Sequence, residues 1–280
     1  MTNTGTLPTV PNLHNRACFM TDLIPPHFPQ ASHLFRIRAH VEGDSRFLAL
    51  LAGGSILHGG FDDWSDLDLV LVVRDDAYDM VMATRREFAA GCGDLLSAFT
   101  GEHVGEPRLL ICLFGPDVIH VDLKFVTGDA LDAMVERPVV IWSRDPQINE
   151  RVTNADVSWP DMPPDWFEER IWTWLHYGAT KLARGELFEA IALLDMIREK
   201  VLAPMIHTAE GRPQRGLRRL EQHVSPLTQK LAATLAAHDR EDVRRALLAS
   251  MELYTQLRPD DLIHSPAEAA VRAFLKTHCP

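Results

Sequence analysis

The sequence predicts an α+β protein, with an N-terminal mixed-sheet domain followed by an all-α helical-bundle domain. Three observations lead to this fold class. Short apolar runs bounded by glycine, proline and aspartate gather in the first half of the chain, as is typical of strands. A stretch with several prolines, residues 146–165, indicates a linker. Beyond this linker, apolar residues recur at helical spacing.

The N-terminal half is expected to combine strands with short helices. Residues 1–28 contain four prolines and little periodicity, so we expect a loosely ordered arm there. The apolar run that starts at Phe47 predicts a strand that enters a turn at Gly53-Gly54-Ser55. The other elements predicted in this half are helices over 30–40 and 77–90 and strands over 66–73, 108–114, 118–126 and 139–143.

The C-terminal half has the periodicity of helices throughout. The change of character near residue 150 predicts one domain over 29–150 and a second over 151–280. The helices expected in the second domain cover 166–184, 186–210, 217–220, 226–238, 240–257 and 266–278.

Composition and charge restrict the partners that the protein can have. A net charge of −11 repels phosphate backbones and argues against nucleic acid as a partner. It would suit a cationic small molecule, but many cytoplasmic enzymes are equally acidic, and that plainer explanation is favoured. The four cysteines are scattered without metal-binding spacing, and no apolar run reaches the roughly 18 residues of a membrane span. We therefore expect a cytoplasmic protein with reduced thiols and no membrane contact, either a monomer or a homodimer.

The most informative stretch is residues 53–73, GGSILHGGFDDWSDLDLVLVV. In a strand, residues i and i+2 point to the same face, so Asp66 and Asp68 should project side by side. Two adjacent carboxylates repel each other unless a cation neutralises them, and Mg²⁺ prefers carboxylate and phosphate oxygens. Gly54 would let the backbone approach a phosphate, and Ser55 would add a hydroxyl donor where a helix is expected to start.

A third acidic residue fits the same arrangement. In the run VIHVDLKFV, residues 118–126, Asp122 lies between apolar residues that would face the core. A charge on such a strand needs a partner, which a neighbouring metal site would supply. Together with Asp66 and Asp68, Asp122 would hold two metal ions on one nucleoside triphosphate and stabilise an in-line displacement. We predict that these three aspartates are both metal ligands and catalytic residues.

Three sequence elements together resemble the polymerase-β-like nucleotidyltransferase superfamily. They are Ala52-Gly53-Gly54-Ser55, Asp66-Leu67-Asp68 and Val121-Asp122-Leu123. The layout looks most like that of the bacterial aminoglycoside and lincosamide nucleotidyltransferases, in which a minimal α/β catalytic domain precedes a helical acceptor-binding domain. The motif match covers roughly residues 47–126, and the helical half matches only in kind.

The resemblance implies an activity and further site residues. It implies a Mg²⁺-dependent enzyme that moves a nucleoside monophosphate, AMP from ATP in the leading reading, to a hydroxyl of a small molecule. The expected acceptor is an aminoglycoside or a lincosamide, which would make the protein an antibiotic-resistance enzyme. Gly54 and Ser55 would bind the nucleotide. Lys181, on the first long helix of the second half, would neutralise the leaving pyrophosphate.

Several alternatives stay open. The favoured proton acceptor is Asp122, but an acid of the helical half could take this role, and Lys181 could equally be a solvated surface charge. Arg170 and His176 form an R-x5-H arrangement similar to that of the helical RNase toxins of the HEPN group. The chain could also adenylylate a protein partner, as antitoxin-type nucleotidyltransferases do, or sense nucleotide without catalysis. The helical acids considered as bases are Glu168, Glu169, Glu186 and Asp195.

Overall fold

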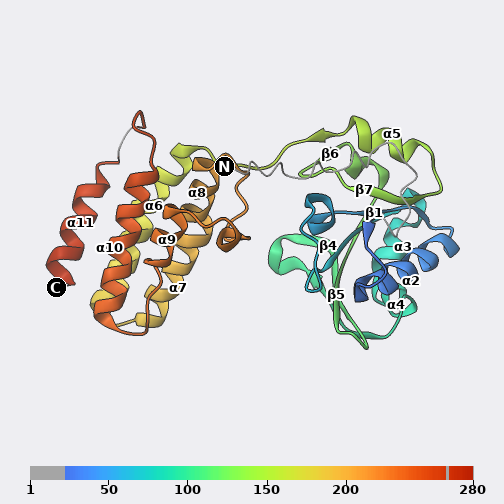
Figure 1. Cartoon of the computed structure of the whole chain (residues 1–280), viewed down its shortest axis with the longest axis horizontal. Helices are drawn as coiled ribbons and strands as arrows, with labels where there is room; N and C mark the ends of the chain where they lie inside the picture. Colours follow the sequence, from blue (N-terminus) through green and yellow to red (C-terminus); the bar gives the residue numbers. More distant parts are fainter. Residues whose placement is uncertain (1–22, 263–264, 280) are drawn as a thin grey trace, which may run out of the picture. The chain divides into compact units, whose positions relative to one another are not determined.

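The computed structural model describes residues 23–262 and 265–279 and confirms the α+β class (Figure 1). Its contacts divide the chain into one compact unit that ends at Ser158 and a second that begins at Trp159. Most of the predicted arm, residues 1–22, lies outside the described residues. Of the arm residues that are described, Leu23 and Ile24 are buried in the core of the first unit.

The first unit is built on a mixed sheet whose described strands follow the order β3-β4-β5-β2-β1-β7. Strands β2 and β5 run parallel, and the other neighbouring pairs of this sheet are antiparallel. The strands are β1 (Phe47–Ala52), β2 (Leu67–Val73), β3 (Leu95–Gly101), β4 (Glu106–Phe114), β5 (Ile119–Val126) and β7 (Val139–Ser143). A small parallel pair is formed by β6 (Ala133–Met134) and β8 (Asp156–Val157).

Helices cover the two faces of this sheet unequally. On one face, α2 (Pro29–Gly43), α3 (Tyr78–Ala83) and α4 (Arg85–Gly91) pack on apolar side chains from β1 to β5 and form the larger core (Figure 1). On the other face, α5 (Gln147–Asn154) contributes Ile148 and Val152 to a smaller core over β1, β2 and β5. Short 3-10 turns lie at Gly54–His58 (η2), Asp75–Ala77 (η3), Glu102–Val104 (η4) and Gly128–Leu131 (η5).

The structure differs from the prediction at three places in this unit. Strand β3 was not predicted because only Ala98 and Gly101 of its residues are buried, so it lacks the apolar alternation of a half-buried strand. The predicted linker 146–165 contains α5, whose buried Ile148 and Val152 stand four residues apart on one helix face. The helix expected over 77–90 is interrupted at Thr84 and forms α3 and α4.

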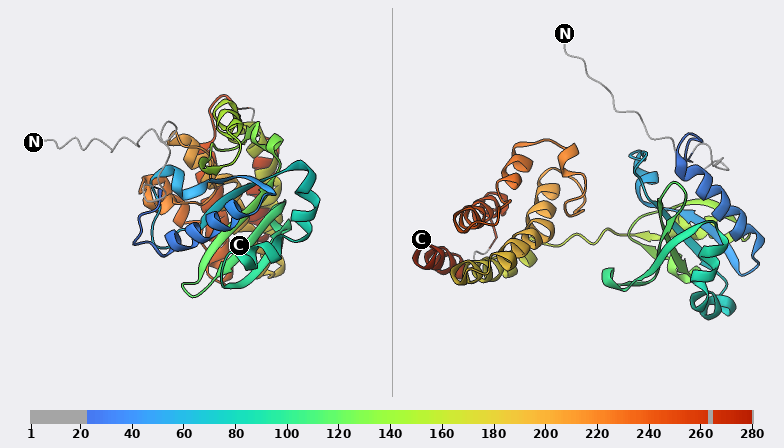
Figure 2. Two further views of the ribbon diagram at one scale, coloured as in Figure 1. Left: turned by 90° about the vertical axis from the view of Figure 1, so that its right-hand side faces the viewer. Right: turned by 90° about the horizontal axis from the view of Figure 1, so that it is seen from below.

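The second unit is all helical within its described residues, and its long helices lie side by side (Figure 2). The helix expected over 186–210 is divided by a π-helical turn, and the one expected over 226–238 ends at Ala232. At 217–220 only the start of a 3-10 turn, Leu220–Gln222, is present. The α-helices are α6 (Pro164–Arg184), α7 (Leu187–Ile197), α8 (Ala203–Ala209), α9 (Pro226–Ala232), α10 (Arg240–Leu257) and α11 (Ala267–His278).

A buried carboxylate joins three parts of the second unit. Glu168 on α6 is 5% exposed, and it accepts hydrogen bonds from the indole of Trp172 at 2.9 Å, the backbone N–H of Ser265 at 2.7 Å and the hydroxyl of Tyr254. The guanidinium of Arg258 lies 3.4 Å away. Burial alone would raise the pKa of Glu168, but the hydrogen bonds from Tyr254, Ser265 and Trp172 and the charge of Arg258 together lower it.

Replacing Glu168 with alanine is expected to destabilise the protein by about 3 kcal/mol, because Arg258 would lose a buried partner and three donors would lose their acceptor. Folding lowers the pKa of Glu168, so its contribution to the free energy of unfolding depends on pH. The contribution is complete above the pKa that Glu168 has in the unfolded chain, and it is lost as the pH falls towards the lower pKa of the folded protein. Chemical denaturation of wild type and Glu168→Ala between pH 3 and 7 measures both effects. Glu169→Ala, whose side chain is 69% exposed, is the matched control and should change stability little. Equal losses in the two variants would contradict the assignment.

Candidate functional site

Two of the predicted aspartates are direct neighbours in the sheet. Asp68 on β2 and Asp122 on β5 are register partners in the parallel pair, so their Cα atoms lie about 4.8 Å apart and their side chains share one face. The neighbours Leu67, Leu69, Val121 and Leu123 point into the larger core, as predicted. The strand pattern therefore places two carboxylates side by side on the face away from α2, α3 and α4.

The same face carries two residues that the sequence analysis did not single out. His120 and Lys124 stand two residues before and after Asp122 on β5, so strand alternation could have identified them. Nε2 of His120 lies 2.9 Å from Oδ1 of Asp122. Nζ of Lys124 lies 2.7 Å from Oε2 of Glu106. Hydrogen bonds from Arg108 and then Lys124 outweigh burial and lower the pKa of Glu106 to about 2.

The glycine turn packs directly against Asp68. The backbone N–H of Gly53 donates to the carbonyl oxygen of Asp68 at 2.9 Å, which fixes the turn to β2. Gly54 has a φ of 63°, and a Cβ atom added there would lie 1.7 Å from Oδ2 of Asp68. The missing side chain of Gly54 is thus what leaves room for the Asp68 carboxylate.

Ser55 follows in the 3-10 turn η2 rather than in the expected longer helix. Its Oγ is buried and has no hydrogen-bond partner in the described part of the chain. A buried hydroxyl without a partner loses several hydrogen bonds that water would supply, so such atoms are uncommon in folded proteins. The turn thus holds one polar group whose hydrogen-bonding capacity is not used by the described part of the chain.

Asp66 lies just outside the strand. β2 begins at Leu67, one residue later than predicted, and Asp66 is a half-buried residue at the end of the preceding loop. We predicted that Asp66 and Asp68 project side by side because we expected both to lie in one strand. This arrangement therefore stays a prediction. The structure brings Asp68 together with Asp122 and with the glycine turn.

The chemistry of these residues fits a magnesium ion shared with a nucleotide. Within residues 23–262 and 265–279, no three His, Cys, Asp or Glu side chains stand close enough together to hold a metal on their own. Mg²⁺ in nucleotide sites is commonly bound through one or two carboxylates, with phosphate and water oxygens completing the octahedron. Asp68 and Asp122 supply such a pair of carboxylates. The hydroxyl of Ser55 is a further oxygen of this turn, and it has no hydrogen-bond partner in the described part of the chain.

Lys181 lies on α6 in the second unit, where acidic side chains hold it. Its Nζ lies 2.6 Å from Glu186 and 2.5 Å from Glu189, and these contacts raise its pKa above the usual range. Its ammonium group also lies 5.0 Å from the centre of the Tyr177 ring. A role of Lys181 in binding the triphosphate stays a prediction, and it would require exchange of these carboxylates for phosphate.

The other candidates of the helical unit also have local partners. Glu168 belongs to the buried network described above, Glu169 pairs with Arg170 at 3.0 Å, and Asp195 pairs with Arg198 at 3.1 Å. Of the predicted R-x5-H arrangement, Arg170 stacks on the ring of Trp166 and His176 packs edge to face on Phe274. These contacts account for the positions of all these side chains without a ligand.

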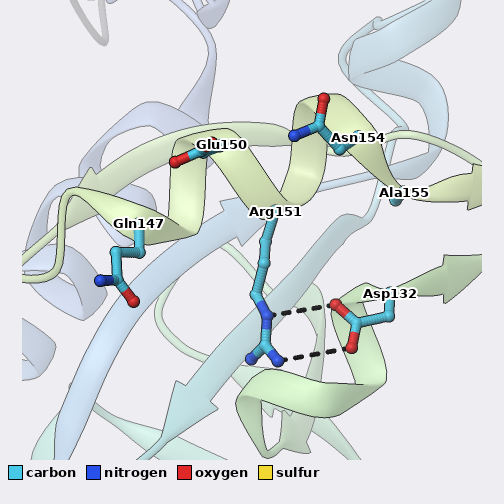
Figure 3. Close-up of a pocket in the computed structure, with 6 residues that line it drawn as sticks. All are labelled: Asp132, Gln147, Glu150, Arg151, Asn154 and Ala155. Carbon is cyan, nitrogen blue, oxygen red and sulfur yellow. Dashed lines mark hydrogen bonds and ion pairs between the residues drawn. The ribbon is translucent and has the colours of Figure 1, made fainter.

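A separate cavity of about 480 Å³ lies beside α5 (Figure 3). Arg151 on α5 extends across it to Asp132, with Nε 3.1 Å from Oδ1, as the dashed lines in the figure show. None of the predicted site residues lines this cavity, whose other lining residues are Gln147, Glu150, Asn154 and Ala155.

Comparison with known proteins finds similar solved structures. No protein-family model and no curated protein matches the sequence. An aminoglycoside 6-adenyltransferase from Bacillus subtilis is similar in structure, with a TM-score of 0.39 and 15% identity over 88% of this chain and 97% of its own. A nucleotidyltransferase-like protein from Exiguobacterium sibiricum has a TM-score of 0.35 and 10% identity over 81% of this chain and 74% of its own.

Because both TM-scores lie below 0.5 and both identities below 25%, the proposals that follow are based on the residues of this chain alone. None of the helices in the described part of the chain is long and apolar enough to cross a membrane.

Proposed function

We propose that this protein is a Mg²⁺-dependent nucleotidyltransferase that transfers a nucleoside monophosphate, AMP from ATP, to a hydroxyl of a small acceptor such as an aminoglycoside or a lincosamide. One observation carries the proposal: the register of β2 and β5 sets Asp68 beside Asp122, directly against Gly54. Ser55, the residue after Gly54, has a buried hydroxyl without a hydrogen-bond partner in the described part of the chain. Paired carboxylates beside a glycine turn suit a metal-bound nucleotide.

Each residue has a role in this proposal. Asp68 and Asp122, with Asp66 at the loop end, would hold Mg²⁺, which when bound neutralises charge on the phosphates. Gly54 and Ser55 would bind the phosphate chain through the backbone and the Ser55 hydroxyl. The acceptor oxygen forms a bond to the α-phosphorus while the bond to the pyrophosphate oxygen breaks.

The proton and the leaving group also need partners. The proton of the acceptor hydroxyl passes to Asp122, whose side chain is 22% exposed. Lys181 is proposed to neutralise the pyrophosphate. We also propose that the helical unit binds the acceptor.

Calorimetric titration tests the nucleotide part of the proposal. The purified protein is titrated with ATP, GTP, CTP and UTP, each with and without Mg²⁺, and we expect Mg²⁺-dependent binding of ATP. Pyrophosphate release is then screened over aminoglycosides, lincosamides and candidate protein acceptors. Absence of binding by all four nucleotides would refute the proposal. Turnover on a protein only would identify a protein-modifying enzyme, and nucleotide binding without turnover on any acceptor would indicate a sensor.

A further inference from the structure

A tryptophan stands almost fully exposed in the loop that leads to the paired aspartates. Trp64 is 93% exposed, although indole rings are normally buried for most of their surface. The chain between Trp64 and Asp66 limits their Cα atoms to about 7 Å of separation, and Asp68 lies within about 14 Å. A ligand that contacts the proposed metal site is therefore within reach of this ring.

The loop around Trp64 is held in place without any contribution from its ring. Gln30 on α2 is 1% exposed, and its amide nitrogen lies 3.1 Å from the carbonyl oxygen of Asp63 and 2.8 Å from that of Ser65. A third carbonyl, that of Asp62, lies 3.3 Å from the same nitrogen. The buried amide thus fixes the loop to α2, where a solvent-exposed loop would otherwise be mobile.

Three further contacts fix the conformation of the loop. The carboxylate of Asp62 accepts hydrogen bonds from the backbone N–H of Trp64 at 3.1 Å and from the hydroxyl of Ser65 at 2.9 Å. At the start of the loop, Phe61 packs edge to face on Phe28, with ring centroids 5.4 Å apart. Because the fold holds the loop by these groups, the indole is presented to solvent and contributes little to the core.

The charges around Trp64 select the kind of ring that would stack on it. Asp62 and Asp63 precede it and Asp66 follows it, and no lysine or arginine occurs between His58 and Arg74. Indole is the aromatic side chain with the strongest attraction for cations. A neutral nucleobase carries no positive charge for these carboxylates to attract, whereas an amine-bearing ring would be attracted by both the indole face and the negative charge.

We infer that Trp64 is a specificity-determining residue that stacks on a cyclic, amine-bearing acceptor in the proposed active site. The inference rests on the proposed function, which supplies the reaction. The class of acceptor is inferred from the exposed ring of Trp64 and the carboxylates next to it. Asp63 supports the same contact electrostatically. Gln30 acts as a positioning residue, because it holds the loop that presents the ring.

Binding measurements with three probes test the role of Trp64. The amine-bearing probe is kanamycin, the neutral probe of similar size is maltotriose, and the nucleotide probe is α,β-methylene-ATP with Mg²⁺. Kanamycin and maltotriose are titrated without nucleotide, so that their binding is read independently of the nucleotide site. We expect Trp64→Ala to weaken kanamycin binding about tenfold, Trp64→Phe to weaken it by less than about threefold, and neither to change nucleotide affinity.

Further variants separate stacking from charge and from general damage to the fold. Asp63→Asn should weaken kanamycin binding about threefold at low salt and less at 0.5 M salt, because screening reduces the attraction of exposed charges. Met80→Ala removes a side chain that is 61% exposed on α3 and should leave all affinities unchanged. The melting temperature of Trp64→Ala should equal that of the wild type, since its ring is exposed.

The outcomes distinguish this inference from the proposed function. If Trp64→Ala weakens binding of α,β-methylene-ATP and leaves kanamycin binding unchanged, the ring contacts the nucleobase and the inference is wrong. The inference also fails if the wild type binds kanamycin no better than maltotriose, whether or not nucleotide binds. If the wild type binds no nucleotide but binds kanamycin in a way that depends on Trp64, the proposed function is wrong and the inferred acceptor site is retained.

Discussion

Replacing Asp68 with asparagine is expected to lower kcat/KM for pyrophosphate release about a thousandfold, which corresponds to about 4 kcal/mol of transition-state stabilisation. Asparagine keeps the size and the contact with Gly54 but removes the negative charge that is proposed to hold Mg²⁺. The same change at Asp122, its register partner, should have an effect of at least this size, because Asp122 is also the proposed proton acceptor. Steady-state kinetics on the acceptor found by screening, over a range of Mg²⁺ concentrations, measure these effects.

The two aspartate variants can be compared with a neutral control. Asp75 is exposed on the turn η3 after β2, and Asp75→Asn should retain full activity. Both Asp68→Asn and Asp122→Asn should need more Mg²⁺ for half-maximal activity, whereas a purely structural role would lower stability without changing the Mg²⁺ requirement. If Asp68→Asn keeps wild-type activity and Mg²⁺ dependence, the assignment of the metal site is wrong.

Replacing Gly54 with alanine is expected to lower activity at least a hundredfold and to destabilise the protein by about 3 kcal/mol. Two causes act together. A φ of 63° is unfavourable for alanine, and the new Cβ would lie 1.7 Å from Oδ2 of Asp68, so the carboxylate would have to move from its place beside Asp122. Denaturant titration and kinetics on the same preparation measure the two losses.

Gly59 provides a matched control for this substitution. It has a φ of 66°, but a Cβ added there would have no atom within 4 Å. Gly59→Ala should therefore show the conformational cost alone, about 1 kcal/mol, with activity close to that of the wild type. If Gly54→Ala and Gly59→Ala lose the same stability and the same activity, the contact between Gly54 and Asp68 has no special importance.

The elements that the sequence predicted well are those with a clear apolar pattern. Strands β2, β5 and β7 and helices α6 and α10 were found within a few residues, because their buried side chains follow strand or helix spacing. β3 was missed because it lies at the edge of the sheet and buries few side chains. α5 was missed because the prolines on both sides of it obscured two apolar residues one helical turn apart.

The candidate site was predictable in part. The sequence indicates that Asp68 and Asp122 each lie on a strand among core residues, but not that these strands pair in register, because strand pairing depends on contacts far apart in the chain. The orphaned hydroxyl of Ser55 and the loop contacts of Gln30 likewise depend on tertiary packing. The exposure of Trp64 could not be anticipated, since apolar residues are buried by default in a sequence-based prediction.

The parallel register of β2 and β5 restricts how the chain can change in length. A single residue inserted into either strand ahead of its aspartate would turn that carboxylate into the larger core and send Leu67 or Val121 outward. Within the segment that connects the two strands, the turn between β3 and β4 is free of this restriction, because it is exposed at residues 102–105. Descendants of this gene should therefore tolerate insertions and deletions at that turn and almost none within the two strands.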